Sequence, residues 1–149
     1  MRPFALRLLV QTVLVLPLAY PALLHADAGA RQASLYDRLG GSAAIASIAD
    51  ELIDRAAHDP RTRQQWRKVS LHRVKDVLAQ YLCAVTEGPC TYTGDTMRDV
   101  HAGLNITEAQ MYAGVEILRS VMIAHEIPIR ERNEFLALLA PLKNDIVTR

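Results

Sequence analysis

Apolar residues recur every three or four positions along most of the chain, a spacing that places them on one face of an amphipathic helix. The four clearest stripes are Ile45, Ile48, Leu52, Ile53 and Ala56; Leu71, Val74, Leu78, Leu82 and Val85; Met111, Val115, Leu118 and Met122; and Phe135, Leu138, Leu139, Leu142 and Ile146. No alternation of period two lasts long enough to predict a strand. The pattern therefore predicts an all-α protein.

Glycine and proline residues mark the limits of these helices. Gly40–Gly41 separates a short helical turn at 35–39 from a longer helix that we expect Ser42 to cap. Asp59–Pro60 ends that helix, because the residue before a proline is pushed out of the α-helical region. Pro141 lies inside the last apolar stripe and predicts a kink there.

A separate short helix is expected around His101, between two glycines. Gly94 turns the chain before it, and Gly103 ends it. Thr107, with Gln110 three residues later, has the pattern of a capping box and predicts the start of a long helix. His101 is thus held on a well-defined backbone segment, as a side chain that must be aimed at a ligand needs to be.

The composition allows one helical domain with its own core. Half of the 149 residues are apolar, but only 5% are aromatic. The formal net charge is +1, and beyond residue 28 the chain has 15 basic and 15 acidic side chains. This balance gives no electrostatic reason to bind nucleic acid or an anionic membrane surface. No catalytic triad, paired-carboxylate pattern or phosphate-binding loop stands out.

Residues 1–28 have the organisation of a secretory signal peptide. Two arginines precede a mostly apolar stretch, 8–24, and the small residues that end at Ala28 form a cleavage site. The mature domain is therefore predicted at 29–149, in the periplasm or outside the cell, without a membrane anchor. The alternative is an uncleaved anchor, which a short apolar stretch with two prolines disfavours.

The only two cysteines, Cys83 and Cys90, predict a disulfide, because an exported chain with an even cysteine count usually pairs them. Two thiols alone make a poor zinc site, which needs four ligands. The chain also lacks the Cys-x-x-Cys-His pattern of covalent haem attachment.

The region around His101 resembles the proximal region of the truncated haemoglobins, the small globins of bacteria. The residues that carry the resemblance are Tyr92, Thr93, Gly94, Met97, Val100, His101, Ala102, Gly103, Leu104, Ile106 and Thr107. It extends from residues 34–41 to 145–147 and is strongest for the first subgroup of the family, here in an exported form with two cysteines.

The resemblance implies a shortened globin fold, in which two antiparallel helix pairs sandwich a haem group. It makes His101 the proximal ligand of the haem iron, with a backbone carbonyl near the start of its turn orienting the ring. Met97, Val100 and Ile106 are expected to contact the haem, which would be haem b held without a covalent bond. On residue type alone, His101 would be a partly buried, hydrogen-bonded histidine.

On the distal side this chain departs from the family. A gap-free alignment places Ile53 where the family usually has a tyrosine that hydrogen-bonds bound oxygen, and Leu78 where it often has a glutamine. Trp66 replaces a phenylalanine, and Val74 lies on the distal helix. Because these four side chains offer no obvious donor unless the Trp66 indole turns, oxygen is expected to leave quickly.

Four other polar residues receive simpler interpretations. Lys75 and His72 lie on the distal helix as possible sixth iron ligands, but outside its inward stripe, so we expect both to be solvated. His58 and His125 lie at helix ends, where a cationic side chain is favourable, and are interpreted as solvated caps.

The expected function is therefore that of an exported globin that binds the diatomic gases O2, NO and CO, in oxygen binding or transport. Within haem chemistry the alternative is an enzyme that oxidises nitric oxide or reacts with peroxide, but an apolar distal side gives little support to either. An alternative of another class is a haem-free helical interaction module on a globin scaffold.

Overall fold

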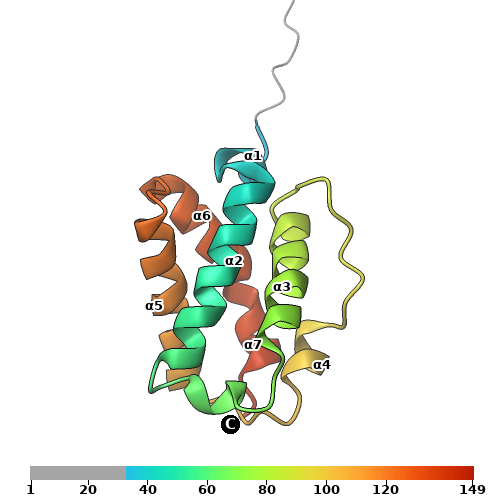
Figure 1. Ribbon diagram of the computed structural model, residues 1–149, viewed down its shortest axis with the longest axis vertical. Coiled ribbons are helices and arrows are strands. Elements are labelled where there is room, and N and C mark those ends of the chain that lie inside the picture. The colour runs from blue at the N-terminus through green and yellow to red at the C-terminus, as the bar shows by residue number, and fades with distance from the viewer. Residues whose placement is uncertain (1–32) are drawn as a thin grey trace, which may run out of the picture. The chain divides into compact units, whose positions relative to one another are not determined.

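The computed structural model describes residues 33–149, a part of the chain that is helical with no β-strand (Figure 1). The helices in chain order are α1 (Leu35–Arg38), α2 (Gly41–His58), η1 (Arg63–Trp66), α3 (Leu71–Val85), α4 (Met97–His101), α5 (Glu108–Ala124), α6 (Ile129–Leu139), η2 (Ala140–Leu142) and α7 (Lys143–Ile146). The predicted signal peptide, 1–28, lies outside the described residues, as do the first four residues of the predicted domain.

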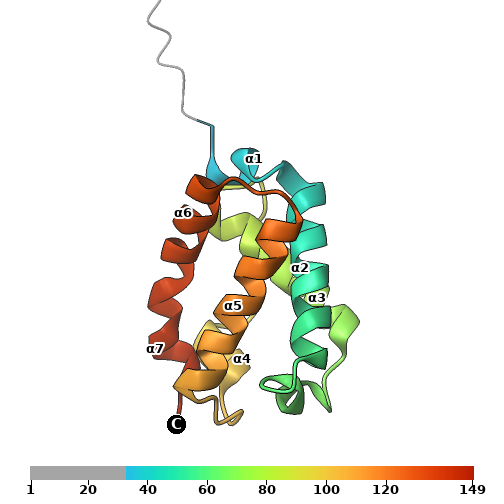
Figure 2. The same ribbon diagram turned by 90° about the vertical axis from the view of Figure 1, so that its left-hand side faces the viewer.

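Two helix pairs form the fold. Helix α2 packs on α3 and also on α5, and α5 packs on α6. Figure 2 shows α5 beside α6 and α2 beside α3. This is the predicted all-α, two-over-two arrangement, and α1 and the short α4 and α7 are added at its edges.

The core lies where the two helix pairs meet. Its most deeply buried side chains include Ile45 and Ile48 from α2, Val121 and Met122 from α5, and Phe135 from α6. Ile45, Ile48, Met122 and Phe135 come from three of the four predicted apolar stripes, and Val121 lies beside Met122. The hydrophobic effect therefore accounts for the pairing of the helices. No helix within residues 33–149 is both long and apolar enough to span a membrane.

The start of α2 differs from the prediction. The helix begins at Gly41 and is capped by Gly40, with φ 106°, and no side chain makes a capping hydrogen bond. Ser42 as the cap is therefore wrong. A Cβ atom added to Gly40 would lie 2.9 Å from the Cβ of Ala44, so both the left-handed conformation and the lack of space require glycine here.

The other predicted helix boundaries agree with the structure. Thr107 and Gln110 form the capping box at the start of α5, in which each side chain accepts a hydrogen bond from the other residue's backbone nitrogen. The last helix is interrupted at Pro141, where the short turn η2 separates α6 from α7. After the break, α7 packs on α4.

Candidate functional site

Helix α4, which carries His101, is five residues long and has a defined cap at its start. The Thr96 hydroxyl oxygen accepts a hydrogen bond from the backbone nitrogen of Asp99, at 3.2 Å. Gly103 follows the helix with φ 74°, a conformation that suits glycine. A helix this short is not stable alone, so its position depends on these local bonds and on the segments around it.

The His101 ring is half-buried and oriented by the backbone of its own helix. Its Nδ1 lies 2.7 Å from the carbonyl oxygen of Met97, at the start of the turn, as the sequence predicts. A carbonyl only accepts hydrogen bonds, so Nδ1 carries the proton and neutral imidazole keeps its lone pair on Nε2. This is the arrangement in which a histidine binds a metal through Nε2, with its ring fixed by a second bond.

Apolar side chains beside His101 lie partly open to solvent. Val100 is 43% exposed and Leu104 is 37% exposed, while Met97 is half-buried and Ile106 is buried. Large apolar side chains that are left in water close to His101 in the sequence favour the binding of an apolar group that covers them. The face of α4 thus fits the flat, mostly apolar surface of a haem.

The four predicted distal residues lie on three elements that pack together. Ile53, on α2, is buried but lies outside the contiguous core cluster. Trp66 in η1 and Leu78 on α3 are half-buried and pack against that cluster, while Val74 on α3 is half-buried. Since α2 packs on both η1 and α3, the structure brings these elements together, with an apolar surface that the core only partly covers.

Gln65, which the sequence analysis did not single out, is the residue before Trp66. Its side-chain oxygen is buried and has no hydrogen-bond partner among the described residues. Such a group is rare in a folded protein and calls for an explanation. Nothing in the polar sequence around it distinguishes Gln65 from its neighbour Gln64.

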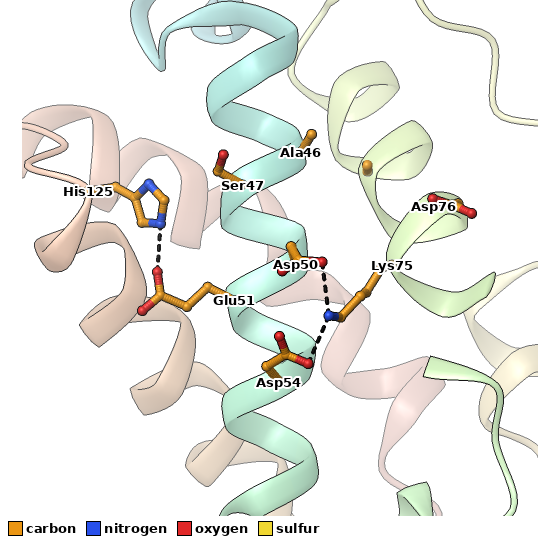
Figure 3. A pocket seen from close by; sticks show the side chains of 9 residues that line it. Ala46, Ser47, Asp50, Glu51, Asp54, Lys75, Asp76 and His125 are labelled. Atoms are coloured by element: carbon orange, nitrogen blue, oxygen red, sulfur yellow. Dashed lines mark hydrogen bonds and ion pairs between the residues drawn. The ribbon is translucent and has the colours of Figure 1, made fainter. Parts of the chain in front are cut away.

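The prediction that Lys75 is solvated is wrong. Its ammonium group lies between Asp50, at 2.9 Å, and Asp54, at 2.8 Å, both on α2 (Figure 3). Hydrogen bonds to Asp54 and Asp50 raise the pKa of Lys75. A lysine held in this way joins α3 to α2 and is not available as an iron ligand, whereas His72, with 89% of its side chain exposed, is solvated as expected.

The interpretation of His125 as a solvated cap is also wrong. Its Nε2 donates to Glu51 on α2 at 2.7 Å, so this side chain joins the end of α5 to α2 (Figure 3). The bond from His125, followed by that from Arg55, lowers the pKa of Glu51. His58 is exposed and its Nδ1 lies 2.7 Å from the Asp54 carbonyl oxygen, which agrees with a cap.

These ion pairs line an open cavity of about 610 Å³. None of the predicted haem-contacting residues lines it. The residues that do are Ala46, Ser47, Asp50, Glu51, Asp54, Lys75, Asp76, Ala79 and His125. This charged hollow is therefore separate from the candidate site around His101.

Cys83 and Cys90 form the predicted disulfide, with their Cα atoms 5.8 Å apart. It joins the end of α3 to the loop that leads to α4. Gly88 lies inside this small ring, and a Cβ atom there would come within 2.7 Å of the Cys83 sulfur, so the ring has no room for a larger residue. The bond links α3, the predicted distal helix, covalently to the loop before α4.

The pattern of the bacterial-like globin family matches residues 34–148 of this chain. Among curated proteins, the chain is similar to the group 1 truncated haemoglobin GlbN of Mycolicibacterium paratuberculosis, with 29% identity over 119 residues, which cover 80% of this chain and 88% of the relative. The GlbN of Nostoc commune is 28% identical over 116 residues, which cover 78% of this chain and 98% of the relative.

The fold is similar to that of solved truncated haemoglobins. The protein from Tetrahymena pyriformis in its Fe(III) form has a TM-score of 0.75 at 19% identity, over 78% of this chain and all of that one. The 2/2 haemoglobin of Synechococcus, in the cyanomet state and with covalently attached haem, has a TM-score of 0.73 at 20% identity and the same coverage.

Proposed function

Because this chain belongs to the bacterial-like globin family and has the truncated haemoglobin fold, we propose that it binds haem b non-covalently, with His101 as the proximal iron ligand, and takes up diatomic gases. When bound, the haem supplies an iron that binds O2, NO and CO. The observation that carries the proposal is the hydrogen bond from His101 Nδ1 to the Met97 carbonyl, which leaves Nε2 as a metal ligand.

The surroundings of the other described histidines favour His101. His72 is exposed beside Asp76, His125 is paired with Glu51, and His58 lies exposed at a helix end. His101 is half-buried and lies close in the sequence to two exposed large apolar side chains, those of Val100 and Leu104. A haem ligand needs this combination of an oriented imidazole and apolar surface for the porphyrin.

The disulfide supports non-covalent haem. Within residues 33–149 neither cysteine is free, since Cys83 and Cys90 are bonded to each other. A thioether bond to haem needs a cysteine thiol, so the disulfide argues against attachment through cysteine, and His101 with apolar contacts is the proposed means of holding the haem.

The distal side chains support weak oxygen binding. Bound dioxygen carries partial negative charge and is stabilised by a hydrogen-bond donor, and Ile53, Val74 and Leu78 have none. Trp66 packs against the core. Carbon monoxide and nitric oxide depend less on such a donor, so we expect this side to favour them over oxygen and to give poor nitric oxide oxidation or peroxide chemistry.

We also propose that residues 1–28 direct export and are removed, which leaves the globin in an oxidising compartment such as the periplasm. The disulfide supports this, because disulfides persist in exported proteins. Mass spectrometry of protein recovered from the periplasm should give a chain that begins at Gly29. Recovery of the full-length chain from the membrane fraction would contradict it.

A haem titration of the mature protein tests the proposed function. Apoprotein should bind one haem with a sharp end point in the Soret absorbance. His101→Ala should lose this stoichiometric binding because the iron loses its protein ligand, while His72→Ala, in which an exposed histidine is removed, should titrate like the parent. Unchanged haem affinity and spectrum in His101→Ala would refute His101 as the ligand. A parent that binds no haem would favour a haem-free interaction module.

A further inference from the structure

We propose that the C-terminal end of the chain, residues 143–149, positions the proximal histidine; we call this segment the C-terminal clasp. The proposal rests on the proposed function, because it concerns how His101 is presented to the haem iron. The clasp comprises α7 and the three residues after it, and it contacts the chain both before and after His101.

The first contact is with α4 itself. Helix α7 packs on α4, and Arg98 Nη2 lies 2.6 Å from Asp145 Oδ1. A five-residue helix needs such tertiary contacts. Because His101 is three residues after Arg98 on the same short helix, a shift of α4 along α7 would move the imidazole with it.

The second contact is with the chain after His101. The backbone nitrogen of Thr148 donates to the carbonyl oxygen of Ile106 at 3.0 Å, and that of Arg149 donates to the same oxygen at 3.3 Å. Ile106 is buried and is one of the predicted haem-contacting residues. The last two residues of the chain thus fix the segment that connects His101 to α5.

A third contact attaches the clasp to α5. Lys143 Nζ lies 2.6 Å from Glu108 and 3.2 Å from the hydroxyl of Tyr112. Hydrogen bonds to Glu108 and then to Tyr112 raise the pKa of Lys143, so this group stays cationic. The clasp is therefore joined to α5, a helix of the core. Through its bonds to α4 and Ile106, it holds the segment around His101 in a fixed position relative to α5.

The three contacts differ in strength. The Arg98–Asp145 pair is exposed, and exposed ion pairs contribute little. Thr148 and Arg149 are exposed too, but their backbone nitrogens hold the main chain directly at the buried Ile106. The donors on Thr148 and Arg149 should therefore matter more than Asp145.

Deletion of residues 148–149 removes both donors to Ile106 and tests the clasp. In the ferrous holoprotein, the iron–histidine stretching band in the resonance Raman spectrum should shift or broaden, because the imidazole is no longer held at one angle. Haem transfer to an excess of an apo-globin acceptor should become about fivefold faster, the factor that corresponds to one hydrogen bond. The matched control replaces both residues by alanine, keeps both backbone nitrogens, and should behave like the parent.

A second variant separates positioning from general loosening. In His101→Gly, imidazole added to the solution can replace the missing side chain without being attached to α4. There, deletion of residues 148–149 should leave the iron–imidazole band unchanged. The same shift in both backgrounds, or no shift in either, would overturn the clasp.

If the deletion variant folds poorly, a second variant, Thr148→Pro, still tests the clasp. Thr148→Pro removes the shorter donor without shortening the chain, and Val147, with φ −78° and ψ 117°, already has a backbone conformation compatible with a following proline. It should give a smaller shift of the same band. Loss of haem binding in His101→Ala, together with an unchanged band in both clasp variants, would leave the proposed function intact and refute only the clasp.

Discussion

The two sides of the candidate haem site are built differently. On the proximal side, His101 is oriented by a carbonyl four residues earlier in its own helix, and that helix is capped by Thr96. On the distal side, Ile53, Trp66 and Leu78 come from separate elements and are placed by packing alone. The His101 ring is oriented by one hydrogen bond to a backbone carbonyl, whereas these distal side chains make apolar contacts.

This difference assigns separate tasks to the two sides. Hydrogen bonds fix direction, so the proximal side is suited to hold the iron at one position and angle. Apolar packing fixes volume without offering charge or donors, so the distal side is suited to admit a small gas molecule and release it. Changes on the proximal side should therefore alter haem attachment, and changes on the distal side should alter gas release.

The largest effect is expected from removal of the disulfide that joins the two sides. Cys83→Ser with Cys90→Ser should lower the free energy of unfolding by about 2.5 kcal/mol, the value for a closed loop of this size in the chain-entropy model. Urea denaturation of parent and variant measures it. Equal stability of the two proteins, or two titrating thiols in periplasmic material, would contradict the role given to this bond.

A smaller effect is expected when the distal side is given a donor. Ile53→Tyr places a hydroxyl on α2, and a neutral hydrogen bond contributes about 1 kcal/mol, so oxygen dissociation should slow roughly fivefold. Carbon monoxide dissociation should change much less, because that ligand accepts weaker hydrogen bonds. Ile53→Leu is the control without a donor and should release oxygen as the parent does.

Stopped-flow measurement of both dissociation rates decides this prediction. Slow oxygen release in the parent would mean that a donor is already present. Trp66, through its indole N–H, and Gln65, through its side-chain NH2 group, would then be the residues to replace next. In that case the contrast between an oriented proximal side and an apolar distal side would fail.

The smallest effect concerns the turn that leads to Trp66. Hydrogen bonds from the Arg61 side chain and backbone hold the pKa of Asp59 at about 2, below its ordinary value of 3.8. Because this pKa is lowered in the folded state, the stabilisation is complete above pH 3.8 and is lost as the pH falls through about 2. The pair is exposed, so the gain is small.

Fluorescence of Trp66, the only tryptophan of the chain, reports on this turn. Asp59→Asn should unfold at lower urea concentration than the parent at neutral pH, and the difference should shrink as the pH falls towards 2. A difference that stays constant over that range would mean that Asp59 does not act through its charge.

Features that depend on residues close together in the sequence are predictable here. The capping box of Thr107 and Gln110, the short helix of His101 and the break at Pro141 each follow from the local chemistry of a few residues. The family resemblance adds the two-over-two fold and the role expected of His101. For the disulfide, the cysteine count and the predicted signal peptide are sufficient.

Features that depend on residues far apart are not predictable from the pattern. The apolar pattern places Lys75 outside the inward face of its helix, which predicts a solvated side chain. Only the packing of α3 on α2 brings it to Asp50 and Asp54. The bond between His125 and Glu51 and the contact of the C-terminal clasp with Ile106 have the same origin. Ser42 fails as a cap for a local reason, because Gly40 takes a left-handed conformation that starts the helix earlier.

The most direct test of the central claim is the iron–histidine stretching band in the resonance Raman spectrum of the ferrous protein. We expect a single band in the parent, its absence in His101→Gly, and its return at another frequency when imidazole is added to that variant. An unchanged band in His101→Gly without imidazole would show that another residue binds the iron, and the assignment of the proximal side would be wrong.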